Sequence, residues 1–118
     1  MTETTSEKPF DLEERTFKFA QRTRAFVKKL PKIMANFEDA RQVIRSSGSV
    51  AANYIEANEA LSKKDFIMRI KVCRKESKES RLWFRLLEVT SELEKERQEL
   101  VQESTELMNI FGSIIRKS

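Results

Sequence analysis

The sequence contains no histidine, a single cysteine, two glycines and two prolines. Without histidine, the chain lacks the commonest general base and the commonest neutral metal ligand. The single cysteine, Cys73, excludes an intrachain disulfide and is compatible with a reducing compartment. Sheets and long loops need turn residues, so scarce glycine and proline favour long helices with short connections. These absences predict an all-α protein.

Long apolar runs are also missing. No stretch approaches the roughly 18 apolar residues of a membrane span, and the polar residues after Met1 do not resemble a signal peptide. We therefore expect a cytoplasmic protein that does not bind membranes. Charged residues make up 36% of the chain, and the net charge is +4. This charge is compatible with RNA or DNA as a partner but does not require one.

The apolar pattern predicts one antiparallel up-down four-helix bundle over residues 10–118, after a disordered leader over residues 1–9. The expected helices run from Phe10 or Asp11 to about Leu30, from Asn36 or Asp39 to Ala60, from Lys63 to about Glu88, and from Ser91 onward. In the first helix, the inward face is expected at Phe17, Ala20, Val27 and Leu30, widened by Phe19 and Phe26. Ser62 and Ser91 are expected to cap the third and fourth helices, with Asp65 and Glu94 three residues on.

The inward row of the third helix limits the chemistry that the protein can perform. We expect this row to be Phe66, Ile70, Cys73, Ser77, Ser80, Phe84 and Leu87. Cys73 on such a row is a buried structural thiol rather than a nucleophile. The inward rows contain no glutamate, which argues against a di-metal carboxylate site, and Gly48 and Gly112 are both expected inside helices, which excludes a phosphate-binding loop. We therefore expect no catalysis, no cofactor, no metal and no small-molecule substrate.

Basic residues form a stripe along the third helix. We call Lys64, Lys71, Arg74, Lys78, Arg81 and Arg85 the basic stripe. Its last five members span about 21 Å at 1.5 Å per residue. Glu76 and Glu79 are expected off the stripe. One interpretation is a track for a phosphate backbone, which needs spaced cations and no base-reading code. The other is a solvated face, or one paired with the glutamates of the fourth helix, which are Glu92, Glu96, Glu99, Glu103 and Glu106.

Aromatic residues on more than one helix face indicate self-association. Trp83 lies among Leu82, Phe84, Leu86 and Leu87, so the end of the third helix is apolar around much of its circumference. A helix that is apolar on more than one face must bury the excess surface, and a subunit interface is the natural place. Tyr54 and Ile55, adjacent on the second helix, indicate the same.

The segment from Arg45 to Ile70, RSSGSVAANYIEANEALSKKDFIMRI, resembles the hallmark segment of the family named for proteins encoded in 23S rRNA intervening sequences. That family typically shows R-x-x-x-S-[IV]-x-x-N-I-x-E-[GA], a short turn, and then [KR]-x-[DE]-F-[IL]. The matching residues are Arg45, Ser49, Val50, Asn53, Glu56, Ala57, Lys63 or Lys64, Asp65 and Phe66. The chain departs from the pattern in the run CRKESKES, where Lys75 replaces a small residue.

The resemblance implies a bacterial homo-oligomer, commonly a pentameric ring of bundles, without known catalysis. The chain is also similar to the accessory variability protein of diversity-generating retroelements, a basic pentameric barrel that binds its reverse transcriptase and nucleic acid. The function that this similarity favours is binding of nucleic acid, RNA above all, without sequence specificity. The alternative is a scaffold that docks an acidic protein such as a reverse-transcriptase-type enzyme. Arg45, Asn53 and Glu56 are expected in an interhelical or inter-subunit polar network.

Overall fold

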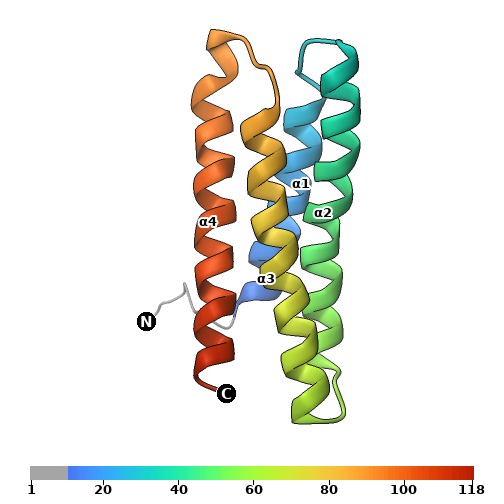
Figure 1. Cartoon of the computed structure of the whole chain (residues 1–118), viewed down its shortest axis with the longest axis vertical. Helices are drawn as coiled ribbons and strands as arrows, with labels where there is room; N and C mark the ends of the chain where they lie inside the picture. Colours follow the sequence, from blue (N-terminus) through green and yellow to red (C-terminus); the bar gives the residue numbers. More distant parts are fainter. Residues whose placement is uncertain (1–10) are drawn as a thin grey trace.

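The computed structural model describes residues 11–118, so the leader predicted for residues 1–9 lies outside it. Four helices run antiparallel to their neighbours in sequence (Figure 1). They are α1 (Leu12–Val27), α2 (Met34–Asn58), α3 (Lys63–Leu86) and α4 (Glu94–Arg116), and a 3₁₀ turn, η1 (Ser91–Leu93), precedes α4. The predicted all-α four-helix bundle is confirmed.

The helices follow one another around the bundle, so α3 lies diagonally opposite α1. In Figure 1, α3 stands in front of α1 and between α2 and α4. The closest packing is between α3 and its two neighbours, and the seam between α1 and α4 is the loosest. Phe84 of α3 meets Phe19 and Phe26 of α1 across the core, edge to face, with ring centroids 6.1 and 6.2 Å apart. These aromatic contacts fill the centre of the bundle.

The buried face of α1 differs from the face predicted for it. Phe17 is 54% exposed, whereas Thr16 and Thr23 are fully buried beside Phe19 and Phe26. Each threonine hydroxyl donates a hydrogen bond to the backbone carbonyl four residues earlier, at 2.8 Å. Its polar group is therefore paired although it is buried. A buried hydroxyl that is hydrogen-bonded escapes the penalty of desolvation. The prediction at Phe17 was wrong because it ranked side chains by hydrophobicity alone.

Small polar residues bring α2 and α3 close together. Ser46 of α2 and Ser80 of α3 are both fully buried, and their hydroxyl oxygens lie 2.7 Å apart. Deeper along the same interface, the Cys73 thiol donates to the carbonyl of Val50 at 3.6 Å. Short side chains allow close helix approach, and these hydrogen bonds satisfy the polar groups buried there.

Two of the predicted helix starts differ in outcome. The Ser62 hydroxyl accepts a hydrogen bond from the backbone N–H of Asp65 at 3.0 Å, as predicted for the start of α3. Ser91 instead begins η1, and no side chain caps α4. The backbone turn of η1 takes the place of the predicted cap. At the other two ends, α1 ends at Val27 rather than near Leu30, and α2 begins at Met34, before Asn36.

Asn36 joins the two loops at one end of the bundle. Its side-chain amide donates to the carbonyls of Pro31 at 3.0 Å and Glu88 at 2.9 Å. Its side-chain oxygen accepts from the backbone N–H of Glu88 at 2.9 Å. One buried side chain therefore holds the α1–α2 loop against the end of α3. None of the helices in residues 11–118 is both long and apolar enough to cross a membrane.

Candidate nucleic-acid interface

The basic stripe lies on the outer flank of α3, on the side of α4. All of its residues are exposed except Arg81, which is half-buried. Arg74 shows that this flank faces α4. Its Nε lies 3.5 Å from the point where Gly112 of α4 would carry a Cβ if it were an alanine. The opposite flank of α3 faces α2, because Arg69 donates to Asn53 at 2.9 Å. Residues three and four apart share one helix face, so the other stripe residues lie on the same flank of α3 as Arg74.

Three of the five glutamates that were considered as partners for the stripe, Glu96, Glu103 and Glu106, bind basic residues of α1 or the residues just after it instead. Arg15 of α1 binds Glu103 at 2.8 Å and Glu106 at 2.7 Å. Lys29, just after α1, binds Glu96 at 2.8 Å. These pairs bridge the loosest seam of the bundle. These three glutamates are therefore not partners of the stripe, which leaves a phosphate track and a solvated face as its interpretations.

The pKa values reflect this pairing. The hydrogen bonds that Arg15 donates to Glu103, followed by the one it donates to Glu106, raise the pKa of Arg15 above its ordinary value. A hydrogen bond from Gln102, and a second from Arg15, lower the pKa of Glu106. Both groups are therefore held in their charged forms, as opposite charges in contact require.

The side of α4 that faces α3 adds positive charge rather than removing it. Arg97 donates to the carbonyls of Phe84 at 3.2 Å, Arg85 at 3.3 Å and Leu87 at 2.7 Å, at the end of α3. The one glutamate on this side, Glu94, is bound to Arg97 at 2.7 Å. Among residues 11–118, no ion pair includes a residue of the basic stripe. The face shared by α3 and α4 is therefore cationic.

Two shallow hollows accompany the stripe. One is lined by stripe residues together with Lys75, Glu79 and Leu82. The other is lined by Lys63, Lys64, Ile67, Met68 and Lys71. Neither hollow has an aromatic side chain on which a base would stack. Lys75, the departure from the family pattern, adds a further cation to this surface.

The polar residues of the hallmark segment do not form the single network that was expected. Arg45 binds Glu76 at 3.3 Å and lies 3.8 Å from Glu79, both on α3. Asn53 donates to the carbonyl of Ser49 at 3.0 Å and to its hydroxyl at 2.9 Å. Arg69 of α3 donates to Asn53 at 2.9 Å, so Arg45 and Asn53 make two separate interhelical links within one chain. A network between subunits stays a prediction.

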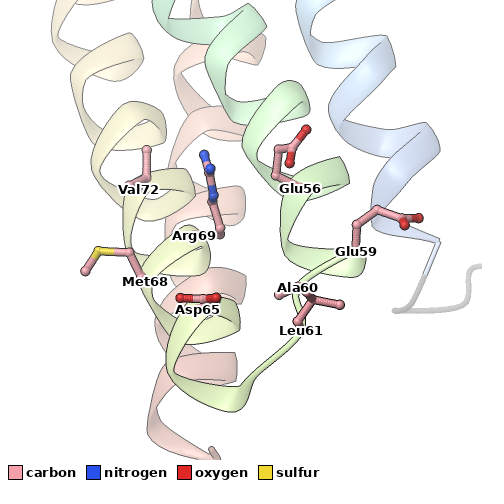
Figure 2. Close-up of a pocket in the computed structure, with 8 residues that line it drawn as sticks. All are labelled: Glu56, Glu59, Ala60, Leu61, Asp65, Met68, Arg69 and Val72. Atoms are coloured by element: carbon pink, nitrogen blue, oxygen red, sulfur yellow. The ribbon is translucent and has the colours of Figure 1, made fainter.

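Glu56 makes no hydrogen bond or ion pair with another side chain of residues 11–118, and it lines a hollow beside the turn between α2 and α3. The hollow is lined by Glu56, Glu59, Ala60, Leu61, Asp65, Met68, Arg69 and Val72. Figure 2 shows Arg69 rising between the two helices and Glu56 on the α2 side. No cluster of His, Cys, Asp or Glu in residues 11–118 is arranged to hold a metal ion. The hollow therefore has mixed charge and no metal-binding geometry.

Glu76 is the residue whose position the sequence did not reveal. It was expected off the inward row, yet it is only 6% exposed, between α2 and α3. The expectation that buried faces contain no glutamate was therefore wrong at this position. Arg45 makes the burial possible because a buried carboxylate needs a paired cation. Arg45 and Glu76 are 31 residues apart in the sequence, so no local pattern indicated that they would pair.

The residues predicted to mediate self-association separate into two groups. Tyr54 is 7% exposed and packs against Phe111 with centroids 6.1 Å apart, so it belongs to the core of one chain and not to a subunit surface. Trp83 is half-buried against the core, and its indole N–H is shielded from solvent without an acceptor within the described chain. Leu82 and Leu86 beside it are about half exposed, at 45% and 52%. Exposed apolar side chains therefore lie beside the stripe at the end of α3. Others lie elsewhere, among them Ile55 of α2, which is 45% exposed.

Comparison with known proteins agrees with this architecture. One solved structure, that of a protein of unknown function from the S23 ribosomal protein family of Bacteroides thetaiotaomicron, superposes with a TM-score of 0.79. It is 29% identical in sequence, and the match covers 92% of this chain and 97% of the other. No curated protein matches the chain by sequence. The profile of the 23S rRNA-intervening sequence proteins matches residues 8–113, nearly the whole chain, and the protein therefore belongs to that family.

Proposed function

We propose that this protein is a non-catalytic bundle that binds nucleic acid, with RNA favoured, through the phosphate contacts of the basic stripe. The observation that supports the proposal is the contrast between two sets of charges. Glu96, Glu103 and Glu106 of α4 are paired with Lys29 and Arg15, while the stripe has no ion-pair partner within residues 11–118. An exposed row of unpaired cations attracts a polyanion and releases its counterions.

The geometry of the stripe suits contacts to the backbone rather than to bases. From Lys71 to Arg85 the cations follow every three or four residues, so they are about 5 Å apart along the helix axis. The hollows that accompany them are bordered by Leu82, Ile67 and Met68 rather than by aromatic rings. Phosphate contacts without base contacts position a strand but do not select its sequence. Binding is therefore expected to be insensitive to sequence.

A second function is favoured by the apolar side chains beside the cations. Leu82 and Leu86 are exposed next to Arg81 and Arg85, and a mixed apolar and basic surface also fits an acidic protein. In this alternative the chain is a scaffold that docks a partner such as a reverse-transcriptase-type enzyme. The purified protein would then fail to retain RNA by itself.

The same apolar surface supports the proposal that the protein is a homo-oligomer, with a pentamer favoured by the family resemblance. Trp83 and Leu86 are the residues that we expect at the interface between copies. Light scattering of the purified protein after gel filtration measures its mass directly. A mass near that of one 13.9 kDa chain at micromolar concentration would contradict this part of the proposal.

Charge reversal tests the stripe. In the double variant Lys71→Glu, Lys78→Glu, two phosphate contacts are lost and two repulsive charges appear. The log–log salt slope for single-stranded RNA should change by about 1.4, since each contact contributes about 0.7. Lys18→Glu with Lys28→Glu is the matched control, since both residues are exposed on the α1 side and the change in net charge is equal.

The two variants are compared by fluorescence anisotropy of a labelled RNA at several salt concentrations. Their helix content and mass should equal those of the wild type, since all four residues are exposed. Equal weakening in both variants would mean that net charge alone attracts RNA. Unchanged binding in the stripe variant would refute the assignment of the stripe.

A further inference from the structure

Two arginine side chains from different helices cover Gly112 of α4. A Cβ added to Gly112 would lie 3.4 Å from Nη1 of Arg116 and 3.5 Å from Nε of Arg74. Gly112 itself is buried beneath them. Arg116 reaches this position because helical side chains lean toward the N-terminus and residue i covers residue i−4. Both guanidinium groups therefore lie over the same helical turn, one from α3 and one from α4.

Neither of the two arginines is neutralised by an acidic partner among residues 11–118. Neither Arg74 nor Arg116 belongs to an ion pair in the described part of the chain. The sequence from Leu107 to Ser118 contains no aspartate or glutamate. Like charges held close together repel each other, and an anion placed between them removes that repulsion. The planar guanidinium fork matches the oxygens of a phosphate group, which it binds through paired N–H donors.

We propose that Arg74 and Arg116 form a clamp for one phosphate group of the nucleic-acid backbone, over Gly112. The inference rests on the proposed function and gives the bound strand a path. Arg74 belongs to the basic stripe, whereas Arg116 lies at the end of α4 and was not among the residues predicted from sequence. The bound strand is therefore contacted from both α3 and α4 where it passes Arg74.

Replacing Arg116 tests the clamp with a matched control one residue away. Arg116→Gln removes one of the two guanidinium groups on this phosphate and should lower the affinity for single-stranded RNA about tenfold, as expected for the loss of a charge-assisted hydrogen bond. The log–log salt slope should change by less than about 0.7, because Arg74 still holds the same phosphate. Lys117→Gln changes the net charge equally. The side chain at 117 points about 100° away around α4, so this variant should bind RNA like the wild type.

The outcomes separate this inference from the proposed function. If the wild type binds no RNA, the proposed function fails, and the clamp fails with it. If the wild type binds and the Arg116 and Lys117 variants behave alike, the clamp is refuted while the stripe remains. If Arg116→Gln alone weakens binding, the clamp is supported.

A second measurement identifies the source of the phosphate. The Nε–Hε signals of Arg74 and Arg116 are followed by NMR during titration with inorganic phosphate and, separately, with a short RNA. Joint shifts of both signals at a lower concentration of RNA phosphate than of inorganic phosphate support a strand site. Shifts with inorganic phosphate at concentrations where RNA produces none would overturn the assignment to nucleic acid.

Discussion

Asn36 gives the sharpest test of how the loops are held. The residue is 2% exposed and makes three hydrogen bonds to backbone groups, one at Pro31 and two at Glu88. A hydrogen bond contributes about 0.5–1.5 kcal/mol to stability, and a buried group left unpaired costs about 1–3 kcal/mol. Glu88 is near the surface, so water can replace part of the hydrogen bonding that its backbone groups lose. We therefore expect Asn36→Ala to lower the free energy of unfolding by about 2–4 kcal/mol.

The assay is urea unfolding followed by circular dichroism at 222 nm, with Asn109→Ala as the control. Asn109 is exposed on α4, so its replacement should change stability by less than about 0.5 kcal/mol. A loss below about 1 kcal/mol for Asn36→Ala, with an unchanged m-value, would refute the account of this bridge.

Asn36→Asp extends the test to pH. The carboxylate keeps the acceptor for the Glu88 N–H but faces two carbonyl oxygens without a proton to donate. Burial and these dipoles would raise its pKa in the folded state above the unfolded value. The protonated form restores a donor, so the loss relative to the wild type should be greatest at neutral pH and shrink as pH falls below the folded-state pKa. A loss that grows as pH falls would contradict this sign.

The remaining predictions concern α3. Arg97→Lys should lower the free energy of unfolding by about 1–2 kcal/mol, because one ammonium cannot reach three carbonyls at the end of α3 and Glu94 together; unchanged urea unfolding would contradict this. Burial raises the pKa of Cys73 to about 12, whereas an unfolded cysteine titrates near about 8.5. At pH 8.5 the folded thiol is therefore almost wholly protonated, and its reaction with a disulfide reagent should proceed only at the rate of opening. Rapid reaction in the native protein would show that the α2–α3 interface is accessible.

The sequence predicted those parts of the fold that local spacing determines. The inward row of α3 from Ile70 to Phe84 and the cap at Ser62 follow from periodicity and from residue type. The face of α1 did not follow, because the burial of Thr16 and Thr23 depends on hydrogen bonds that hydrophobicity does not encode. The helix ends at Val27 and Met34 were also displaced by a few residues. Pro31 limits how far α1 can extend but does not fix its last residue, and Ile33 before α2 has no capping side chain.

The site was predicted only in part, since pairing between helices depends on their rotation. The spacing of the stripe was evident in the sequence, but the partners of the α4 glutamates were not. Glu103 was as plausible a partner for Arg81 as for Arg15 until the packing placed it beside α1. Arg116 was missed because its neighbour across the groove, Arg74, is 42 positions away in the sequence.

The salt dependence of RNA binding by the wild-type protein tests the central claim most directly. A labelled single-stranded RNA is titrated with the purified protein at several salt concentrations, and the logarithm of affinity is plotted against that of salt. Five stripe contacts predict a slope of about −3.5, and Arg116 leaves that slope nearly unchanged because it shares the phosphate of Arg74. Absence of binding at low salt, or an affinity that does not change with salt, would contradict the account.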